Sequence, residues 1–366
     1  MKEFILATAV LMSTIVGVGM FGIPYAGAKS GFLISAFFLL VLTIIMTLIH
    51  LFYGEIVSKT KEKHRLPGYA GYYLGERWKR IVGFFVVVGF YGSLLVYILV
   101  GGKFLQLAFS PIINLPQSTF NLIFFAIGSI AVYFGLRLIA GLDLLMGLFL
   151  ILIVFLFLFM GLNKIDINNL KIINWRSAIV PYGVILYALA GMAAVPEIRN
   201  IFKKNEKHFK KAIIWGTAIP GVLYLIFAGT VIGLSGNKVS SEAVGGLGGT
   251  LGDRAVILGA IFGFLATITS FFVLGLSLKE SYIRDFGFHK NWAWFITCFV
   301  PLGLFALGIQ NFLLIITILG ALLGLIECTS IILIRKKIAP RISKWLGCFM
   351  ILVFVIGFIY TLIKIF

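Results

Sequence analysis

The sequence predicts an all-α polytopic membrane protein, and its composition and the length of its apolar runs carry that prediction. Hydrophobic residues make up 61% of the 366 residues and charged residues only 12%, with a mean hydropathy of +1.09. Soluble domains of this size do not have such a composition. The 41 glycines and 36 phenylalanines suit a bundle of helices, in which small residues let backbones approach closely. The segments of alternating hydropathy that a transmembrane barrel requires are not evident.

About eleven apolar runs are long enough to cross roughly 30 Å of hydrocarbon as helices. In chain order they are residues 4–28, 31–57, 81–109, 118–138, 141–162, 178–200, 212–235, 254–283, 291–311, 312–334 and 343–365. The first run is too long for a signal peptide and has no small-residue cleavage site, so we expect it to be retained. We assign residues 1–335 to one core and residues 336–366 to an additional C-terminal helix.

Basic residues between the runs predict how the chain is oriented. Lysine and arginine gather after the second run, within 59–80, and after the sixth, within 199–211. Cytoplasmic loops of membrane proteins carry this excess, so both loops and the N-terminus are expected inside a cell membrane that the chain crosses many times. The formal charge of +18 therefore indicates orientation, and we expect no nucleic-acid partner.

Two of the runs carry interruptions at corresponding positions. In the first, Gly17-Val18-Gly19 precedes Pro24, and in the sixth, residues 188–191 (Ala-Leu-Ala-Gly) precede Pro196. An unpaired backbone group in hydrocarbon costs several kcal/mol, so a broken helix is retained only where it lines a cavity or binds a ligand. Each break lies in the first run of a block of five runs, and the two blocks are 4–162 and 178–334. Because five is odd, the second block enters from the opposite side, which predicts the inverted repeat of a secondary transporter.

Each break would present backbone groups to a ligand. The second half-helix of the first run points free N–H groups and a partial positive charge into the bundle, which suits a carboxylate. The N–H groups in question belong to Gly17, Val18, Gly19 and Met20. Carbonyls of residues 13–16, with those of Tyr187 and Ala190, suit an ammonium group or a small cation. No charged residue lies near either break, which argues against cationic and acidic substrates.

Residues 266–270, Ala-Thr-Ile-Thr-Ser, place one carbonyl and two hydroxyls on a single helical turn of the eighth run. An uncharged set of oxygen ligands suits sodium. The alternative is that these hydroxyls bond back to their own helix, as serine and threonine in membrane helices commonly do.

The segment 13–26 (Ser-Thr-Ile-Val-Gly-Val-Gly-Met-Phe-Gly-Ile-Pro-Tyr-Ala) resembles the first helix of amino acid permeases. The families are the amino acid/auxin and aromatic amino acid permeases of the amino acid-polyamine-organocation superfamily. Residues 187–197 and the lysine-rich stretch after them are similar to helix 6 of the same families. The resemblance covers the first ten runs and implies a LeuT-type 5+5 inverted repeat with helices 1 and 6 broken.

That resemblance implies roles for particular residues. The break in helix 1 would hold the carboxylate of the substrate. Helices 1 and 6 would hold its amino group, and helices 3, 6 and 8 would surround its side chain. The substrate-binding residues would be Thr14, Gly17, Val18, Gly19, Met20, Tyr97, Tyr187, Ala188, Ala190 and Gly191. A sodium site would use the carbonyls of Ser13 and Val16 together with Ala266, Thr269 and Ser270. Some proton-driven relatives place a lysine in helix 5, but residues 142–162 contain none, which favours sodium.

Three acidic residues within or beside the runs are candidates for gating or proton coupling. Glu327 lies in the middle of the tenth run, where an acid is a functional candidate by default, the alternative being a packed, protonated residue. Glu55 and Glu197 are expected to pair with basic side chains on the cytoplasmic side. Residues 66–75 are expected to form an interfacial helix, and the glycine-rich segment 240–253 either an outer lid or a plain linker.

The leading functional hypothesis is a sodium-coupled secondary transporter that imports a neutral, hydrophobic or aromatic, amino acid by alternating access. A proton-coupled permease and an amino acid receptor that does not transport remain as alternatives. We expect no enzyme, because the chain lacks a His-Glu-x-x-His sequence, a nucleophile elbow and a phosphate loop. The expected partners are the amino acid and the lipid bilayer. Sodium is the one ion expected, with no other cofactor, and the sequence does not predict an oligomeric state.

Overall fold

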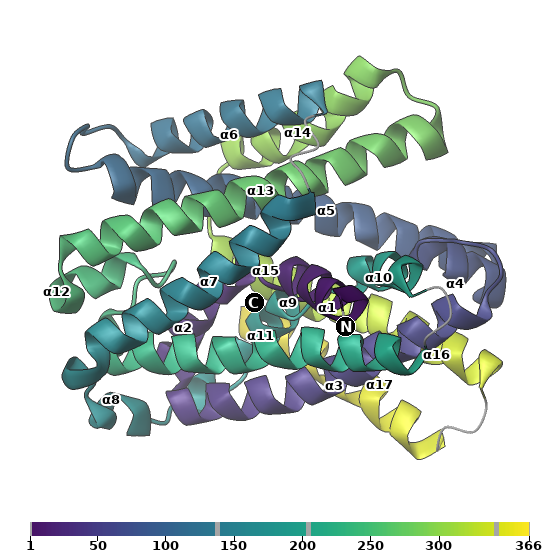
Figure 1. The fold of residues 1–366 in the computed structure, drawn as a ribbon, viewed down its shortest axis with the longest axis horizontal. Helices are drawn as coiled ribbons and strands as arrows, with labels where there is room; N and C mark the ends of the chain where they lie inside the picture. The colour runs from purple at the N-terminus through teal and green to yellow at the C-terminus, as the bar shows by residue number, and fades with distance from the viewer. Residues whose placement is uncertain (1, 136–139, 203–205, 340–343, 366) are drawn as a thin grey trace.

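The computed structural model describes residues 2–135, 140–202, 206–339 and 344–365 (Figure 1). The elements of the first half are α1 (Lys2–Ile15), α2 (Gly19–Ser30), α3 (Phe32–Lys59), α4 (Leu66–Leu74), α5 (Glu76–Phe109), α6 (Gln117–Phe134) and α7 (Ala140–Gly161). The elements of the second half are α8 (Ile167–Lys171), α9 (Val180–Ala188), α10 (Val195–Ile201), α11 (Glu206–Ser235), α12 (Gly248–Leu251), α13 (Asp253–Phe286), α14 (Lys290–Ala306), α15 (Phe312–Leu323), α16 (Thr329–Ile338) and α17 (Lys344–Ile365). The described residues contain no strand, so the predicted all-α class is confirmed.

The predicted runs coincide with helices or with broken helices. Eight helices of the described chain are long and apolar enough to cross a membrane, and the bent pair α1 and α2 makes a ninth. The two other predicted runs correspond to α7 and α14, which have 22 and 17 residues. The predicted interfacial helix is α4, which begins with a proline in its first turn and ends before Gly75. The end of the fourth predicted run, at 136–138, lies outside the described residues.

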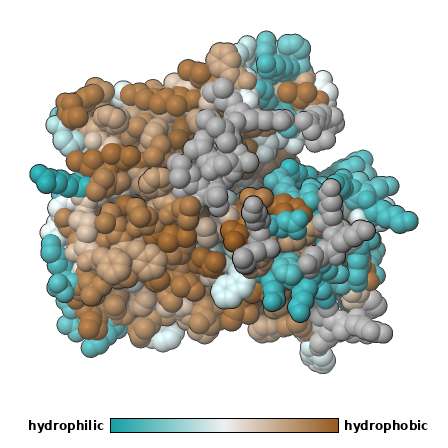
Figure 2. All heavy atoms as spheres, viewed as in Figure 1, coloured by the Kyte–Doolittle hydropathy of each residue, from teal (hydrophilic) through white to brown (hydrophobic). Residues whose placement is uncertain are grey.

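The helices pack together as a bundle. Figure 1 shows α9 and α15 between a group that contains α5, α6, α13 and α14 and a group that contains α3 and α11. The most extensive contacts between helices are those of α5 with α13, of α9 with α15, and of α1 with α11. On the face in Figure 2 a broad apolar surface is followed by polar residues at the edge near α4, α10 and α16. A belt of this kind suits contact with lipid.

Two predicted details of the second half differ from the structure. The segment after α11 is no plain flexible linker, because the side chains of Ala243, Val244 and Leu247 are completely buried and two short helical turns follow. The tenth run is not uniformly α-helical either, since residues Gly324–Cys328 form a π-helix between α15 and α16. This local widening contains Glu327, and π-bulges often occur at functional positions.

Candidate functional site

The first break lies where the sequence predicts it. Helix α1 ends at Ile15, α2 begins at Gly19, and the two axes differ by 56°. The Val16 amide closes α1 by donating to the Met12 carbonyl at 2.8 Å, and the Met20 amide donates to the Gly17 carbonyl at 3.2 Å. The Met20 amide is therefore already used by the turn, in contrast to our expectation of a free donor. The amides of Gly17, Val18 and Gly19 donate no hydrogen bond to the part of the chain that the structure describes.

The second break interrupts the sixth run between α9 and α10. Helix α9 ends at Ala188, Leu189 leaves helical geometry with φ −91° and ψ 2°, and Gly191 has φ −138° and ψ 10°. A short 3₁₀ turn over Met192–Ala194 then leads into α10. Both interruptions are therefore real departures from α-helix.

The two breaks pack against each other through their glycines. A Cβ added to Gly19 would lie 2.7 Å from the Ala188 Cα and 2.9 Å from its Cβ. In the same way, a Cβ added to Gly191 would collide with the side chain of Ile15. The glycine after each break thus rests on the last helical residue before the other break. Such a reciprocal contact is expected when two halves of a chain are related by inverted symmetry.

One tyrosine that sequence reasoning missed joins the two breaks. The Tyr224 hydroxyl, on α11, donates to the Ile15 carbonyl at 2.9 Å and to the Ala188 carbonyl at 3.0 Å. These carbonyls end α1 and α9, and Tyr224 is completely buried. Carbonyls at helix C-termini carry a partial negative charge and lack partners within the helix, so a single O–H group serves both ends. No spacing rule identifies a lone tyrosine in an apolar run, and only the fold brings it to this position.

Aromatic and hydroxyl side chains border the first break from α5, α9 and α13. A Cβ added to Gly17 would lie 3.9 Å from both the Tyr97 and the Ser270 hydroxyl oxygens and closer to nothing else. Tyr187 contacts Gly19 with its ring, and its hydroxyl donates to the Ser93 hydroxyl at 2.9 Å. The structure therefore brings Tyr97, Tyr187 and Ser270 to the break, as predicted. A Cβ at Gly17 would therefore meet its neighbours at ordinary contact distance, whereas a Cβ at Gly19 would collide with α9.

Among the residues predicted to bind sodium, Ser13 lies on α1 and Val16 directly follows that helix, whereas the other three lie on α13. The hydroxyls of Thr269 and Ser270 donate to the Ala266 carbonyl at 3.1 and 2.9 Å, so they also make the backbone bonds that the alternative interpretation expects. The carbonyls of Ser13 and Val16 accept no hydrogen bond from the described residues. Ser270 also approaches the first break, because its hydroxyl oxygen would lie 3.9 Å from a Cβ added to Gly17.

Three further predicted site residues lie around the breaks. The Thr14 hydroxyl is exposed and donates to the Val10 carbonyl at 2.8 Å. Ala190 is exposed as well, whereas the Val18 side chain is buried and packs in the core. Val18 can therefore offer a ligand its backbone but not its side chain.

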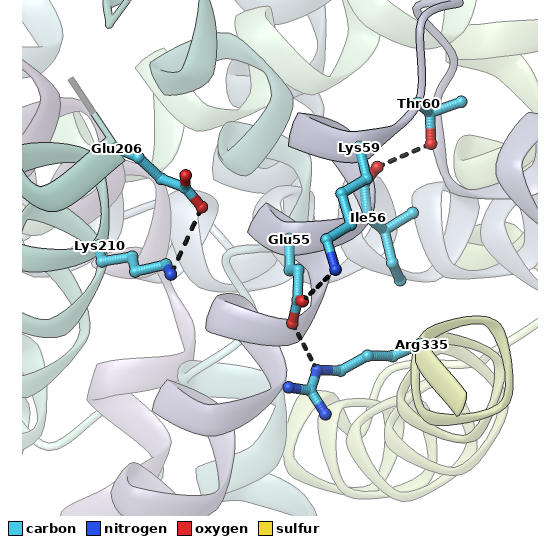
Figure 3. Close-up of polar contacts among 7 residues, drawn as sticks. All are labelled: Glu55, Ile56, Lys59, Thr60, Glu206, Lys210 and Arg335. Atoms are coloured by element: carbon cyan, nitrogen blue, oxygen red, sulfur yellow. Dashed lines mark hydrogen bonds and ion pairs between the residues drawn. The ribbon is translucent and has the colours of Figure 1, made fainter. Parts of the chain in front are cut away.

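Ion pairs gather at the end of the bundle that carries the basic loops. Glu55 of α3 contacts Lys59 and Arg335 of α16, each at 2.8 Å (Figure 3). Arg65, which precedes α4, contacts Glu197 of α10 at 3.2 Å. Both acids pair with basic residues, as predicted, and the pairs link α3 to α16 and α4 to α10. Glu327 lies in the π-helix Gly324–Cys328, between α15 and α16.

The chain is similar in sequence to a known protein family over most of its length. A family model described as the tryptophan/tyrosine permease family matches residues 1–322. The chain belongs to the tryptophan/tyrosine permease family. Its members are amino acid permeases, so the chain is a multi-pass membrane protein and a secondary transporter of amino acids. No curated protein sequence matches this permease.

Solved structures resemble the permease over almost its whole length. MhsT in complex with L-phenylalanine has a TM-score of 0.65 at 17% identity, covering 99% of this chain and 97% of that chain. Mhp1 in an inward-facing conformation has a TM-score of 0.68 at 13% identity, covering 99% and 88%. A manganese transporter of Eremococcus coleocola has a TM-score of 0.66 at 10% identity, covering 99% and 94%. At these identities the likeness shows the fold, which is the LeuT-type fold that the sequence predicts.

Proposed function

We propose that this permease imports a neutral aromatic amino acid together with sodium, by alternating access around the two broken helices. The observation that carries the proposal is the meeting of the breaks at Gly19 and Ala188, next to Gly17, where an added Cβ would make only ordinary contacts with Tyr97 and Ser270. Free amides at Gly17 and Val18 would bind the carboxylate. The rings of Tyr97 and Tyr187 lie where they would contact an aromatic side chain.

The absence of charge supports a zwitterionic substrate with a neutral side chain. Within the described residues, the side chains nearest to a Cβ added at Gly17 or Gly19 are those of tyrosine, serine and alanine. Because the opposite partial charges of the half-helices match the two ends of a zwitterion, no charged side chain is required. A charged substrate side chain would have no counter-ion there and would be costly to desolvate.

The sodium proposal rests on the unused carbonyls of Ser13 and Val16 and on the Ser270 hydroxyl next to Gly17. Carbonyl and hydroxyl oxygens are suitable ligands for a hard cation. A membrane potential of 100 mV supplies about 2.3 kcal/mol per charge, which is enough for roughly fifty-fold accumulation before any ion gradient is counted. One coupled cation is therefore an adequate driving force.

A proton-coupled mechanism is the second candidate, because Glu327 lies in the membrane within a π-helix. Uptake of L-tryptophan into proteoliposomes distinguishes the two. Sodium coupling predicts accumulation driven by an inward sodium gradient. Equal accumulation from a proton gradient in sodium-free buffer would contradict sodium coupling, and binding without any counterflow would favour a receptor.

A further inference from the structure

The outward face of α11 changes from charged to aromatic to aliphatic along the helix. Lys207 and Lys211 are exposed in its first two turns, and Trp215, one turn later, is 55% exposed. Residues four apart share a helical face, so these three side chains lie in one row. The row continues to Val222, which is 56% exposed. Figure 1 shows the start of α11 at the same end of the bundle as α4, α10 and α16.

The other side of α11 is packed inside the protein. Phe209, Ile213 and Thr217 are buried, and Tyr224 of the same helix joins the two breaks. The segment Glu206–Lys238, which contains α11, is long and apolar enough to cross a membrane. The exposed row therefore faces the bilayer, with its lysines at the end of the helix that carries the basic loops.

The two lysines of the row carry charges that the protein does not neutralise. Neither Lys207 nor Lys211 forms an ion pair with any other residue that the structure describes. Several other basic side chains at this end of the bundle do contact a carboxylate. They are Lys59, Arg65, Lys79, Arg80 and Lys210. Lys210, which lies between the two lysines of the row in the sequence, contacts Glu206 at 3.4 Å (Figure 3).

An anionic phospholipid has the chemistry that fits this row. Each lysine near a membrane surface strengthens the binding of anionic lipid roughly fivefold. Tryptophan prefers the level just below the headgroups. Val222 lies eleven residues after Lys211, or about 17 Å further along the helix, which places it at the depth of the acyl chains. A soluble acidic protein could pair with the lysines but could not reach this depth, whereas one lipid molecule contacts both parts.

We propose that the outward face of the first half of α11 binds an anionic phospholipid. The headgroup phosphate would lie between Lys207 and Lys211, and an acyl chain would lie along Trp215 toward Val222. The proposal is independent of the proposed function, because it uses neither break. It places the lipid on the helix that carries Tyr224, and so in contact with the element that joins both breaks.

Quenching of Trp215 fluorescence by brominated lipids tests the proposal. The full-length protein is reconstituted into phosphatidylcholine vesicles that contain brominated phosphatidylglycerol or, in parallel, the same fraction of brominated phosphatidylcholine. The Trp215 signal is the difference between each protein and the same protein with Trp215→Phe. We expect the wild type to prefer phosphatidylglycerol at least fivefold and Lys207→Gln/Lys211→Gln to show less than a twofold preference. Lys207→Arg/Lys211→Arg keeps both charges and should keep the preference.

A charge-matched control separates a lipid site from a general effect of charge. Lys79→Gln/Lys210→Gln also removes two lysines, but both already contact a carboxylate, so we expect the wild-type preference. High salt should weaken the preference of the wild type, because exposed charges are screened. Equal quenching by the two lipids in the wild type would overturn the proposal. An unchanged preference in Lys207→Gln/Lys211→Gln, or an equal loss in the control pair, would overturn it as well.

Discussion

The Tyr224 hydroxyl offers a sharp test of how the two breaks are held together. Tyr224→Phe removes one oxygen and nothing else, and it leaves the buried carbonyls of Ile15 and Ala188 without their shared donor. A buried polar group left unsatisfied costs about 1–3 kcal/mol. Because the same carbonyls end the two half-helices, part of that cost will fall on the geometry that binds the substrate.

If the whole free-energy cost of the unsatisfied carbonyls destabilises the conformation that binds substrate, the dissociation constant for L-tryptophan will rise by about 5-fold to 150-fold. Calorimetry or equilibrium binding measures that change, and a thermal melt reports any loss of stability. Tyr182→Phe is a matched control. Tyr182 is also buried and lies on α9, but its hydroxyl donates to the Val353 carbonyl of α17 at 3.4 Å, away from the breaks.

We expect Tyr182→Phe to bind tryptophan as the wild type does. The reasoning would be refuted if Tyr224→Phe bound tryptophan within twofold of the wild type, since the hydroxyl would then contribute nothing to the arrangement of the breaks. A similar loss of affinity in both variants would refute it too.

Three further predictions concern the breaks and the coupling ion. Gly17→Ala should weaken tryptophan binding at least tenfold without lowering the melting temperature, because its Cβ collides with no neighbour but lies beside the amides proposed to bind the carboxylate. Gly19→Ala should lower the melting temperature because its Cβ meets Ala188; the reverse pattern would exchange the two roles. Thr269→Ala should raise the sodium concentration needed for half-maximal uptake, and an unchanged sodium dependence would remove this residue from the ion site. Glu327→Gln should leave sodium-driven uptake within twofold of the wild type, and its complete loss would favour proton coupling.

The sequence predicted most of the fold because its signals are local. Each run's length and hydropathy define a helix, and glycine followed by proline marks both breaks, near Gly17 and Gly191. In a membrane these signals are strong, because hydrocarbon penalises every unpaired backbone group. The π-helix at Gly324–Cys328 has no such signal, since Glu327 marks the segment as unusual but does not predict a change of helix type.

The candidate site was predicted less completely, because its contacts join residues that are far apart in the chain. The separate roles of Gly17 and Gly19 depend on which side chains lie opposite them, and Tyr224 is 209 residues from Ile15. Periodicity and spacing within one helix cannot predict such a meeting.

The central claim is that backbone groups at the breaks, rather than charged side chains, bind the substrate. An experimental structure determined with L-tryptophan tests it most directly. The account predicts a tryptophan carboxylate within hydrogen-bonding distance of the Gly17 and Val18 amides, with the indole ring between Tyr97 and Tyr187. A tryptophan whose carboxylate contacts neither of these amides, or a continuous helix through residues 15–19, would contradict it.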